Sequence, residues 1–146
     1  MALRRKSKKA KVELLRGVSL FSACSNRELD RIASLADEID VPKGRVLIRE
    51  GEPGREFFVV VDGRARATVG DRTRVGKLGP GSSFGEMSLL DQGLRSATVT
   101  AQTDMHLLVI GSRQFSALIK EVPSVARKIL RAMAERLRSA EKEAVH

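Results

Sequence analysis

The stretch Phe84–Val99, FGEMSLLDQGLRSATV, differs from an ordinary strand–turn–strand segment. It places Glu86 directly after a glycine and Arg95 directly before a Ser-Ala pair, with room for one turn of helix between them. Gly85 lets a ligand approach the backbone because it has no side chain. A helical turn that follows it presents unpaired N–H groups, which attract anions. The stretch is therefore interpreted as a ligand-binding loop.

The two charged residues of this loop suit opposite ends of one ligand. Arg95 supplies a planar fork of donors that matches a phosphate, and the Ser96 hydroxyl and the Ala97 N–H can donate to the same oxygens. Glu86 repels a phosphate but accepts a hydrogen bond from a hydroxyl such as a ribose 2′-OH. A surface ion pair between Glu86 and Arg95, worth at most about 1 kcal/mol, is the alternative. The whole pattern favours a ligand with a phosphate beside a free sugar hydroxyl.

Residues 41–110 alternate short β-branched or aromatic runs with turn residues. The runs are RVLI (45–48), FFVVV (57–61), RARATV (64–69), RTRVGKL (72–78), SATVTA (96–101) and MHLLVI (105–110). Gly70-Asp71 is predicted to be a two-residue hairpin turn, because it follows a segment that alternates with period two. Many short strands at nearly even spacing predict a sandwich, a barrel or a jelly roll.

Helical patterns lie on either side of these strands. Ser25 and Glu28 form a capping box that opens a short helix before the strands. After the strands a short helix is predicted over 114–119, and Pro123 opens a longer one that runs to about Ala140. The predicted fold is mainly β with flanking helices. It is a β-roll, or double-stranded jelly roll, between an N-terminal helical segment and a long C-terminal helix.

The loop at 84–99 resembles the phosphate-binding cassette of the cyclic nucleotide-binding domain family. This family includes bacterial catabolite activators, kinase regulatory subunits and cyclic-nucleotide-gated channels. The sequence before the loop is also similar to the family, because its glycines occur in the same order. They lie in GRVLIREGEPG (44–54), FFVVVDG (57–63) and LGPG (78–81). The resemblance covers roughly residues 14–140. It implies a regulatory domain of signal transduction that binds a cyclic nucleotide in a β-roll.

The resemblance also implies roles for the residues of the loop. Gly85 and Ala97 give backbone donors, and Glu86 takes the ribose 2′-OH. Arg95 pairs with the cyclic phosphate, and Ser96 bonds a phosphate oxygen. Ser rather than Thr at position 96 favours cAMP over cGMP by analogy with the family. The ligand-binding residues expected in the loop are Gly85, Glu86, Met87, Ser88, Arg95, Ser96 and Ala97.

The last helix is expected to supply the contact to the base. The chain has no Trp or Tyr, and its five Phe all lie in core-like settings, which argues against an aromatic lid. Arg136 falls on the same helical face as Val125, Ile129 and Ala132, so we hypothesise that it stacks over or bonds the purine. The resemblance supports a base contact from this helix. The alternative is an Arg that extends its head from the core into water.

A second stripe on this helix is spaced 4-3-4-3. It consists of Ala126, Leu130, Met133, Leu137 and Ala140. The stripe is either a homodimer seam, as in the bacterial activators of the family, or the buried face of a helix that lies on the roll. If the protein is a sensor of a cyclic nucleotide, we expect the ligand to order the phosphate-binding loop and to draw this helix onto the base.

The net charge of +9 is concentrated in a basic N-terminal arm. Seven of the 27 Lys and Arg and one of the 18 Asp and Glu fall within residues 1–16, which leaves +3 on the remainder. Residues 4–11 are expected to be a solvated arm that runs into a helix at 12–15. Weak attraction to anionic lipid or nucleic acid is one alternative, and kinase recognition of Arg4-Arg5-Lys6-Ser7 is another. The expected division is arm 1–16, β-roll with short helices 17–122, and lid or dimer helix 123–146.

Composition excludes several other classes of protein. No apolar run approaches the roughly 18 residues of a membrane span. A lone Cys24 suits a reducing compartment, so a cytoplasmic protein is expected. His106 lies in a strand without a partner His, Cys or carboxylate cluster, so it is not expected to bind a metal. No nucleophile–base pair stands out, so we expect no catalysis and no cofactor beyond the cyclic nucleotide.

Two further interpretations keep the binding domain and change its context. One is a truncated transcription regulator of the catabolite-activator kind, which needs a helix-turn-helix after His146. The other is a regulatory domain cut from a channel, a kinase or another effector. The intact Gly, Glu, Arg and Ser of the loop argue against a homologue that binds nothing. The expected partners are a cyclic nucleotide and an unknown effector protein.

Overall fold

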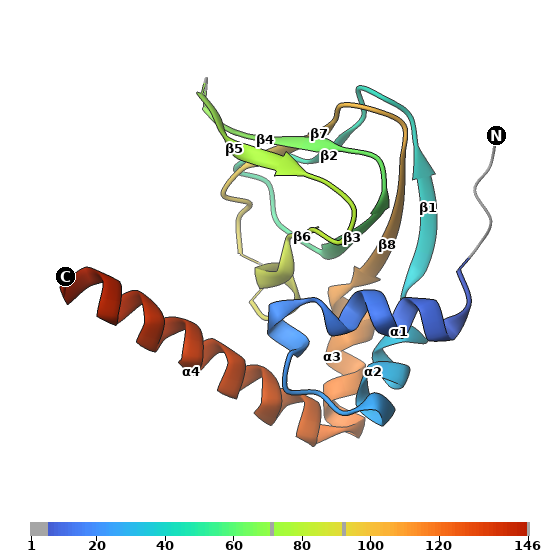
Figure 1. The fold of residues 1–146 in the computed structure, drawn as a ribbon, viewed down its shortest axis with the longest axis vertical. Helices are drawn as coiled ribbons and strands as arrows, with labels where there is room; N and C mark the ends of the chain where they lie inside the picture. Colours follow the sequence, from blue (N-terminus) through green and yellow to red (C-terminus); the bar gives the residue numbers. More distant parts are fainter. Residues whose placement is uncertain (1–5, 71, 92, 146) are drawn as a thin grey trace.

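The computed structural model describes residues 6–70, 72–91 and 93–145, and it shows a β-roll with helices gathered along one side (Figure 1). The strands are β1 (Asp37–Val41), β2 (Val46–Ile48), β3 (Glu56–Asp62), β4 (Ala65–Val69), β5 (Arg72–Leu78), β6 (Ser83–Phe84), β7 (Thr98–Ala101) and β8 (Met105–Gly111). The helices are α1 (Lys8–Arg16), the 3-10 helix η1 (Ser19–Phe21), α2 (Asn26–Ala33), the 3-10 helix η2 (Glu86–Leu89), α3 (Ser112–Glu121) and α4 (Pro123–Val145).

The strands form two four-stranded sheets in which every pairing is antiparallel. One sheet has the order β1-β8-β3-β6, and the other has the order β2-β7-β4-β5. Val69 pairs with Arg72 across the predicted hairpin turn, of which Asp71 lies outside the described residues. The predicted β-roll with flanking helices is confirmed.

Period-two alternation in β3 and β8 divides the interior into two apolar cores. Phe58 and Val60 face the other sheet and form the core inside the roll. Phe57 and Val59 face the helices and pack with η1, α2 and α3. Because successive strand residues point to opposite faces, a continuous apolar strand such as FFVVV is suited to lie between two cores.

The N-terminal segment becomes helical earlier than expected. α1 begins at Lys8 and is capped by the Ser7 hydroxyl, whereas the helix was expected over 12–15. Val12 and Leu15 are buried against the core beside the sheet, which draws the helix onto the body. Residues 8–11 are therefore helical rather than part of an extended arm. Residues 1–5 of the predicted arm lie outside the described residues.

The predicted helices that flank the roll are confirmed, with longer spans for the last two. The Ser25–Glu28 capping box is present at the start of α2, with Ser25 N–H donating to Glu28 at 2.8 Å. Glu28 also accepts hydrogen bonds from Ser124 and Lys128, which tie the start of α4 to α2. Burial opposes its ionisation, but these hydrogen bonds lower the pKa of Glu28 to about 2. The buried carboxylate therefore holds the first turns of α4 against the start of α2.

α4 extends away from the roll toward its C-terminal end (Figure 1). Val125, Ile129 and Ala132, which share one face of this helix, are buried where its first half lies beside η1 and α3. Leu130 and Leu137 of the second stripe are 66% and 64% exposed. The stripe is therefore not the buried face of a helix lying on the roll. Among the described residues, no helix combines the length and the apolar character that crossing a membrane requires.

Candidate functional site

A cavity of about 480 Å³ opens between the Phe84–Val99 loop and the inner face of the second sheet. The sheet contributes apolar side chains to its wall, namely Ile48, Ala67, Leu78 and Val99. The loop contributes all seven residues expected to bind a ligand there: Gly85, Glu86, Met87, Ser88, Arg95, Ser96 and Ala97. The structure thus brings these seven together on one wall, although they are separated by up to a dozen positions along the chain.

A larger hollow of about 630 Å³ lies elsewhere, beside the start of α3. Its charged lining residues are Asp37, Glu56, Arg55 and Arg113, so the two cations are balanced by two anions. Although this hollow is larger, its balanced charge gives no reason to expect a charged ligand there. The smaller cavity is the stronger candidate, because its charged lining residues, Glu86, Asp91 and Arg95, include a buried cation.

Arg95 is that buried cation, with only 8% of its surface exposed. Its Nη1 donates to the Ser88 hydroxyl at 2.5 Å, and its Nη2 donates to the Glu56 carbonyl oxygen at 2.8 Å. Burial lowers the pKa of Arg95, and the more distant Glu56 charge opposes that effect. Among the described residues no carboxylate forms an ion pair with Arg95. Because a buried charge is costly without a counterion, this site favours an anion.

Gly85 allows the loop to pass close to this guanidinium. Its φ is +82°, in the left-handed region, and it precedes the single turn of η2. A Cβ at this position would lie 2.7 Å from Nη1 of Arg95 and 2.9 Å from the Glu56 carbonyl oxygen. Both the conformation and the space therefore require glycine. The helical turn begins at Glu86, directly after Gly85.

Glu86 is half-buried and points toward the last helix. Its Oε1 lies 3.6 Å from Nη2 of Arg136, and the same Nη2 donates to the Ser19 hydroxyl at 2.8 Å. Glu86 therefore pairs with Arg136, and the proposed alternative of a surface pair between Glu86 and Arg95 is not formed. Arg136 does not line the cavity itself. It lies in a neighbouring hollow between η1 and α4 and contacts the site through Glu86.

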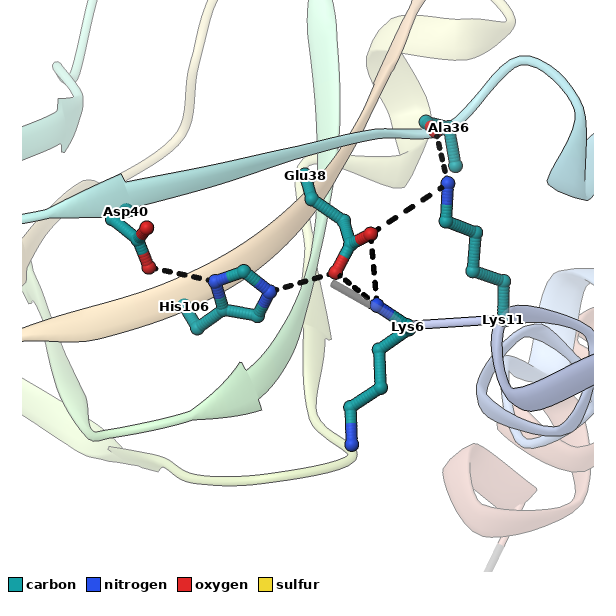
Figure 2. Close-up of polar contacts among 6 residues, drawn as sticks. All are labelled: Lys6, Lys11, Ala36, Glu38, Asp40 and His106. Atoms are coloured by element: carbon teal, nitrogen blue, oxygen red, sulfur yellow. Dashed lines mark hydrogen bonds and ion pairs between the residues drawn. The ribbon is translucent and has the colours of Figure 1, made fainter. Parts of the chain in front are cut away.

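Sequence reasoning missed the surroundings of His106, which is 2% exposed. Its Nδ1 lies 2.7 Å from Asp40 and its Nε2 lies 2.8 Å from Glu38 (Figure 2). The expectation that His106 has no carboxylate partners is wrong. The available signal was the spacing of Glu38 and Asp40, because residues two apart in a strand share one face. No metal site is formed by His, Cys, Asp and Glu within the described part of the chain.

The same cluster ties the N-terminal segment to the sheet. Glu38 accepts from the Lys6 backbone N–H at 2.8 and 3.0 Å, and the Lys11 ammonium lies 3.9 Å away (Figure 2). Burial opposes the charged form of His106, but hydrogen bonds to Glu38 and Asp40 outweigh it and raise the pKa of His106. Two ring nitrogens that both face carboxylates are satisfied by an imidazolium, which donates from each. The cluster is thus a buried ionic support for α1, apart from the cavity.

Comparison with known proteins agrees with this geometry. The family model described as the cyclic nucleotide-binding domain matches residues 38–122, which span the roll and the whole loop. The chain is 35% identical over 133 residues to the cyclic AMP receptor protein of Thermus thermophilus, covering 88% of this chain and 62% of that protein. It is 35% identical over 124 residues to a cyclic nucleotide-gated potassium channel of Rhizobium etli, covering 85% of this chain and 34% of that protein.

A solved structure shows the same fold over most of the chain. The N-terminal domain of a transcriptional regulator from Streptomyces coelicolor superposes with a TM-score of 0.79 at 32% identity. The match covers 88% of this chain and 95% of that domain. The match therefore spans nearly all of this neighbouring domain, but only about a third to three-fifths of the length of the two relatives above.

Proposed function

Because the chain belongs to the cyclic nucleotide-binding domain family, we propose that it is a non-catalytic sensor of a 3′,5′-cyclic nucleotide, with cAMP preferred over cGMP. One observation carries the proposal: Arg95 is a buried cation that forms no ion pair with a carboxylate of the described residues, and it lines a cavity of about 480 Å³. A cyclic phosphate supplies the anion that this guanidinium lacks, in a geometry that its fork of donors matches.

The other residues of the loop are assigned to different parts of the ligand. The Ser96 hydroxyl and the N–H groups of Gly85 and Ala97 donate to the phosphate oxygens. Glu86 accepts from the ribose 2′-OH, because an acid beside a phosphate site suits a hydroxyl and not a second anion. Met87 lines the same cavity and is 49% exposed, so it offers apolar contact at the mouth. This arrangement recognises the sugar and the phosphate but leaves the base to another element.

The base contact is assigned to Arg136 of α4. The five Phe are each at most 7% exposed, so none of them forms a lid. Arg136 is 47% exposed at its side chain and already lies 3.6 Å from Glu86, at the sugar end of the site. A purine that extends from the sugar toward α4 offers this guanidinium a face on which to stack. Ligand binding at Glu86 thereby acts on α4 directly and shifts its position relative to the roll.

The exposed stripe of α4 supports a homodimer as the form that transmits this shift. Leu130 and Leu137 are the most exposed large apolar residues of the helix. They are spaced by one heptad, as in a coiled-coil seam. Two copies that pack along this stripe would remove both from water. We also propose a cytoplasmic location, supported by the lone Cys24, and an effector protein as a further partner.

One titration tests the proposed function. Isothermal calorimetry of the protein with cAMP, cGMP and AMP is expected to show the tightest binding for cAMP and weaker binding for cGMP. AMP is expected to bind least, because its open phosphate has a different shape and charge. Glu86→Gln keeps the size of the side chain and is expected to weaken cAMP more than 2′-deoxy-cAMP. No heat with any of the three nucleotides would contradict the proposal.

A second context has its own support, namely the input domain of a transcription regulator. The observation in its favour is the match to the N-terminal domain of the Streptomyces coelicolor regulator, which this chain covers almost completely. Sequencing the gene beyond the codon for residue 146 tests this context, since a following helix-turn-helix would establish it. A preceding membrane-spanning region would indicate a channel domain instead.

A further inference from the structure

The guanidinium of Arg95 is held by protein groups on two sides. Ser88 accepts from Nη1 at 2.5 Å, and the carbonyl oxygen of Glu56 accepts from Nη2 at 2.8 Å. These contacts use two of its N–H donors, and the others remain for an oxyanion. Ser88 is itself only 4% exposed, although it lines the cavity. Its hydroxyl therefore accepts from Arg95 at a place that is almost closed to solvent.

Gly54 lies on a third side of the Arg95 guanidinium, where there is no room for a side chain. A Cβ there would lie 2.1 Å from the Ser88 hydroxyl and 3.0 Å from Cζ and Nε of Arg95. Such distances force a neighbour to move. The φ of Gly54 is not in the left-handed region, so the backbone itself does not demand glycine. Space around the Ser88–Arg95 contact is therefore what requires glycine at this position.

Hydrogen bonds also fix the backbone that carries Arg95. Arg95 N–H donates to the Glu52 carbonyl at 2.8 Å, and its own carbonyl accepts from Gly51 at 2.9 Å. Gly54 N–H donates to the Gly93 carbonyl at 3.0 Å. The segment 51–54 thus lies across the segment that carries Arg95. The side chain leaves this fixed backbone and meets Ser88 and Glu56, so few rotamers remain open to it.

We propose that Ser88 and Gly54 are positioning residues, which hold the Arg95 guanidinium in the orientation that accepts the phosphate. This inference rests on the proposed function and changes the role expected for Ser88 from ligand contact to support. A guanidinium fixed before the ligand arrives loses less conformational freedom on binding, so affinity rises without a new contact. It also presents its free donors in one direction, so the site discriminates between the two exocyclic oxygens of a cyclic phosphate.

The first experiment needs no nucleotide. Nitrogen-15 NMR measures rotation of the Arg95 guanidinium about its Nε–Cζ bond in the intact chain. Slow rotation is expected in the parent protein, and faster rotation in Ser88→Ala and Gly54→Ala. Ser83→Ala is the matched control, because Ser83 lines the same cavity, whereas the guanidinium donates to Ser88 and to the Glu56 carbonyl. Rotation that is unchanged in Ser88→Ala would overturn the positioning role, whether or not Gly54→Ala folds.

The second experiment measures the consequence for binding. Calorimetry compares cAMP, the two phosphorothioate diastereomers of cAMP and 2′-deoxy-cAMP. Ser88→Ala is expected to weaken cAMP by about tenfold, the usual effect of a hydrogen bond to a charged group. The preference for one diastereomer over the other is expected to shrink, because it reports the orientation of Arg95. The penalty for removing the 2′-OH is expected to stay unchanged, because it reports Glu86.

The outcomes separate this inference from the proposed function. If the parent protein binds none of the four nucleotides, the proposed function fails, and the rotation of the guanidinium alone decides the positioning role. If the parent protein binds and Ser88→Ala weakens all four equally with the diastereomer preference intact, the function stands and the positioning role is wrong. A smaller diastereomer preference together with faster rotation supports both.

Discussion

The Glu86 carboxylate, which belongs to the loop, faces the guanidinium of Arg136, which belongs to the last helix, with 3.6 Å between Oε1 and Nη2. Fifty positions of the chain separate the two residues. In the proposed function, the contact joins the sugar end of the site to the helix that is expected to move. Both side chains are partly exposed, so the pair itself adds little to stability, about 0–1 kcal/mol. Its importance is where it places Arg136.

Replacing Arg136 tests its assignment to the base. Arg136→Ala is expected to weaken cAMP by about five- to tenfold, because a cation over an aromatic ring is worth about 1 kcal/mol at a partly exposed site. The loss is expected to depend on the purine and to be small for ribose cyclic phosphate without a base. Arg138→Ala, which removes an exposed cation of the same helix, is the control. Equal affinity of Arg136→Ala and the parent protein for cAMP would show that the assignment is wrong.

Replacing Arg95 tests the phosphate site. Arg95→Lys keeps the charge but loses the fork of donors, and it cannot reach Ser88 and the Glu56 carbonyl together. We expect a loss of at least about a hundredfold in cAMP affinity, because charge-assisted bidentate contacts are the strong ones. Fluorescence competition with a labelled cAMP measures this. Retention of parent-like affinity by Arg95→Lys would argue against a phosphate at this guanidinium.

Replacing the exposed leucines of α4 tests the dimer. The double variant Leu130→Glu with Leu137→Glu places two like charges along the stripe, and a second copy would face the same charges. Multi-angle light scattering is expected to show a dimer for the parent protein and a monomer for the variant. Arg131→Glu, which changes charge on a neighbouring exposed position, controls for net charge. A parent protein that remains monomeric at high concentration, with and without cAMP, would contradict the proposed seam.

The His106 cluster predicts a specific dependence of stability on pH. The folded protein raises the pKa of His106 above its ordinary value of 6.5. The stabilisation that follows is therefore fully present below about pH 6.5 and is lost as the pH rises through the folded pKa. Urea unfolding between pH 6 and 9 is expected to show a falling free energy of unfolding in the parent protein.

A substitution isolates that contribution. His106→Gln keeps a donor but removes the titration, so its unfolding free energy is expected to lie about 1–3 kcal/mol lower at pH 6. The difference between variant and parent is expected to narrow as the pH rises. Asp40→Asn, at a side chain that is 57% exposed, is expected to lower the pKa of His106 without unfolding the protein. A difference that stays constant from pH 6 to 9 would show that His106 does not titrate there.

Most of the fold can be predicted from local patterns in the sequence. The strand runs, the capping box at Ser25 and the helix opened by Pro123 depend on residues close together in the chain, so their chemistry is legible without coordinates. The predicted start of α1 is wrong, because its first turn is rich in basic residues and resembles a solvated arm. Val12 and Leu15 become buried only when the sheet and η1 are present to receive them.

By itself, the sequence determined the β-roll with its flanking helices and the composition of the loop, because hydrophobic period, turn glycines and an ordered motif are properties of neighbouring residues. Only the tertiary structure decided which groups meet. It set Ser88 and Gly54 around Arg95, Arg136 against Glu86, and His106 between Glu38 and Asp40. Most of these contacts join residues that lie far apart in the chain, and their distances depend on how sheets, helices and loops pack. The spacing of Glu38 and Asp40 shows that they share one face of a strand, but it does not show which residue of another strand lies against that face.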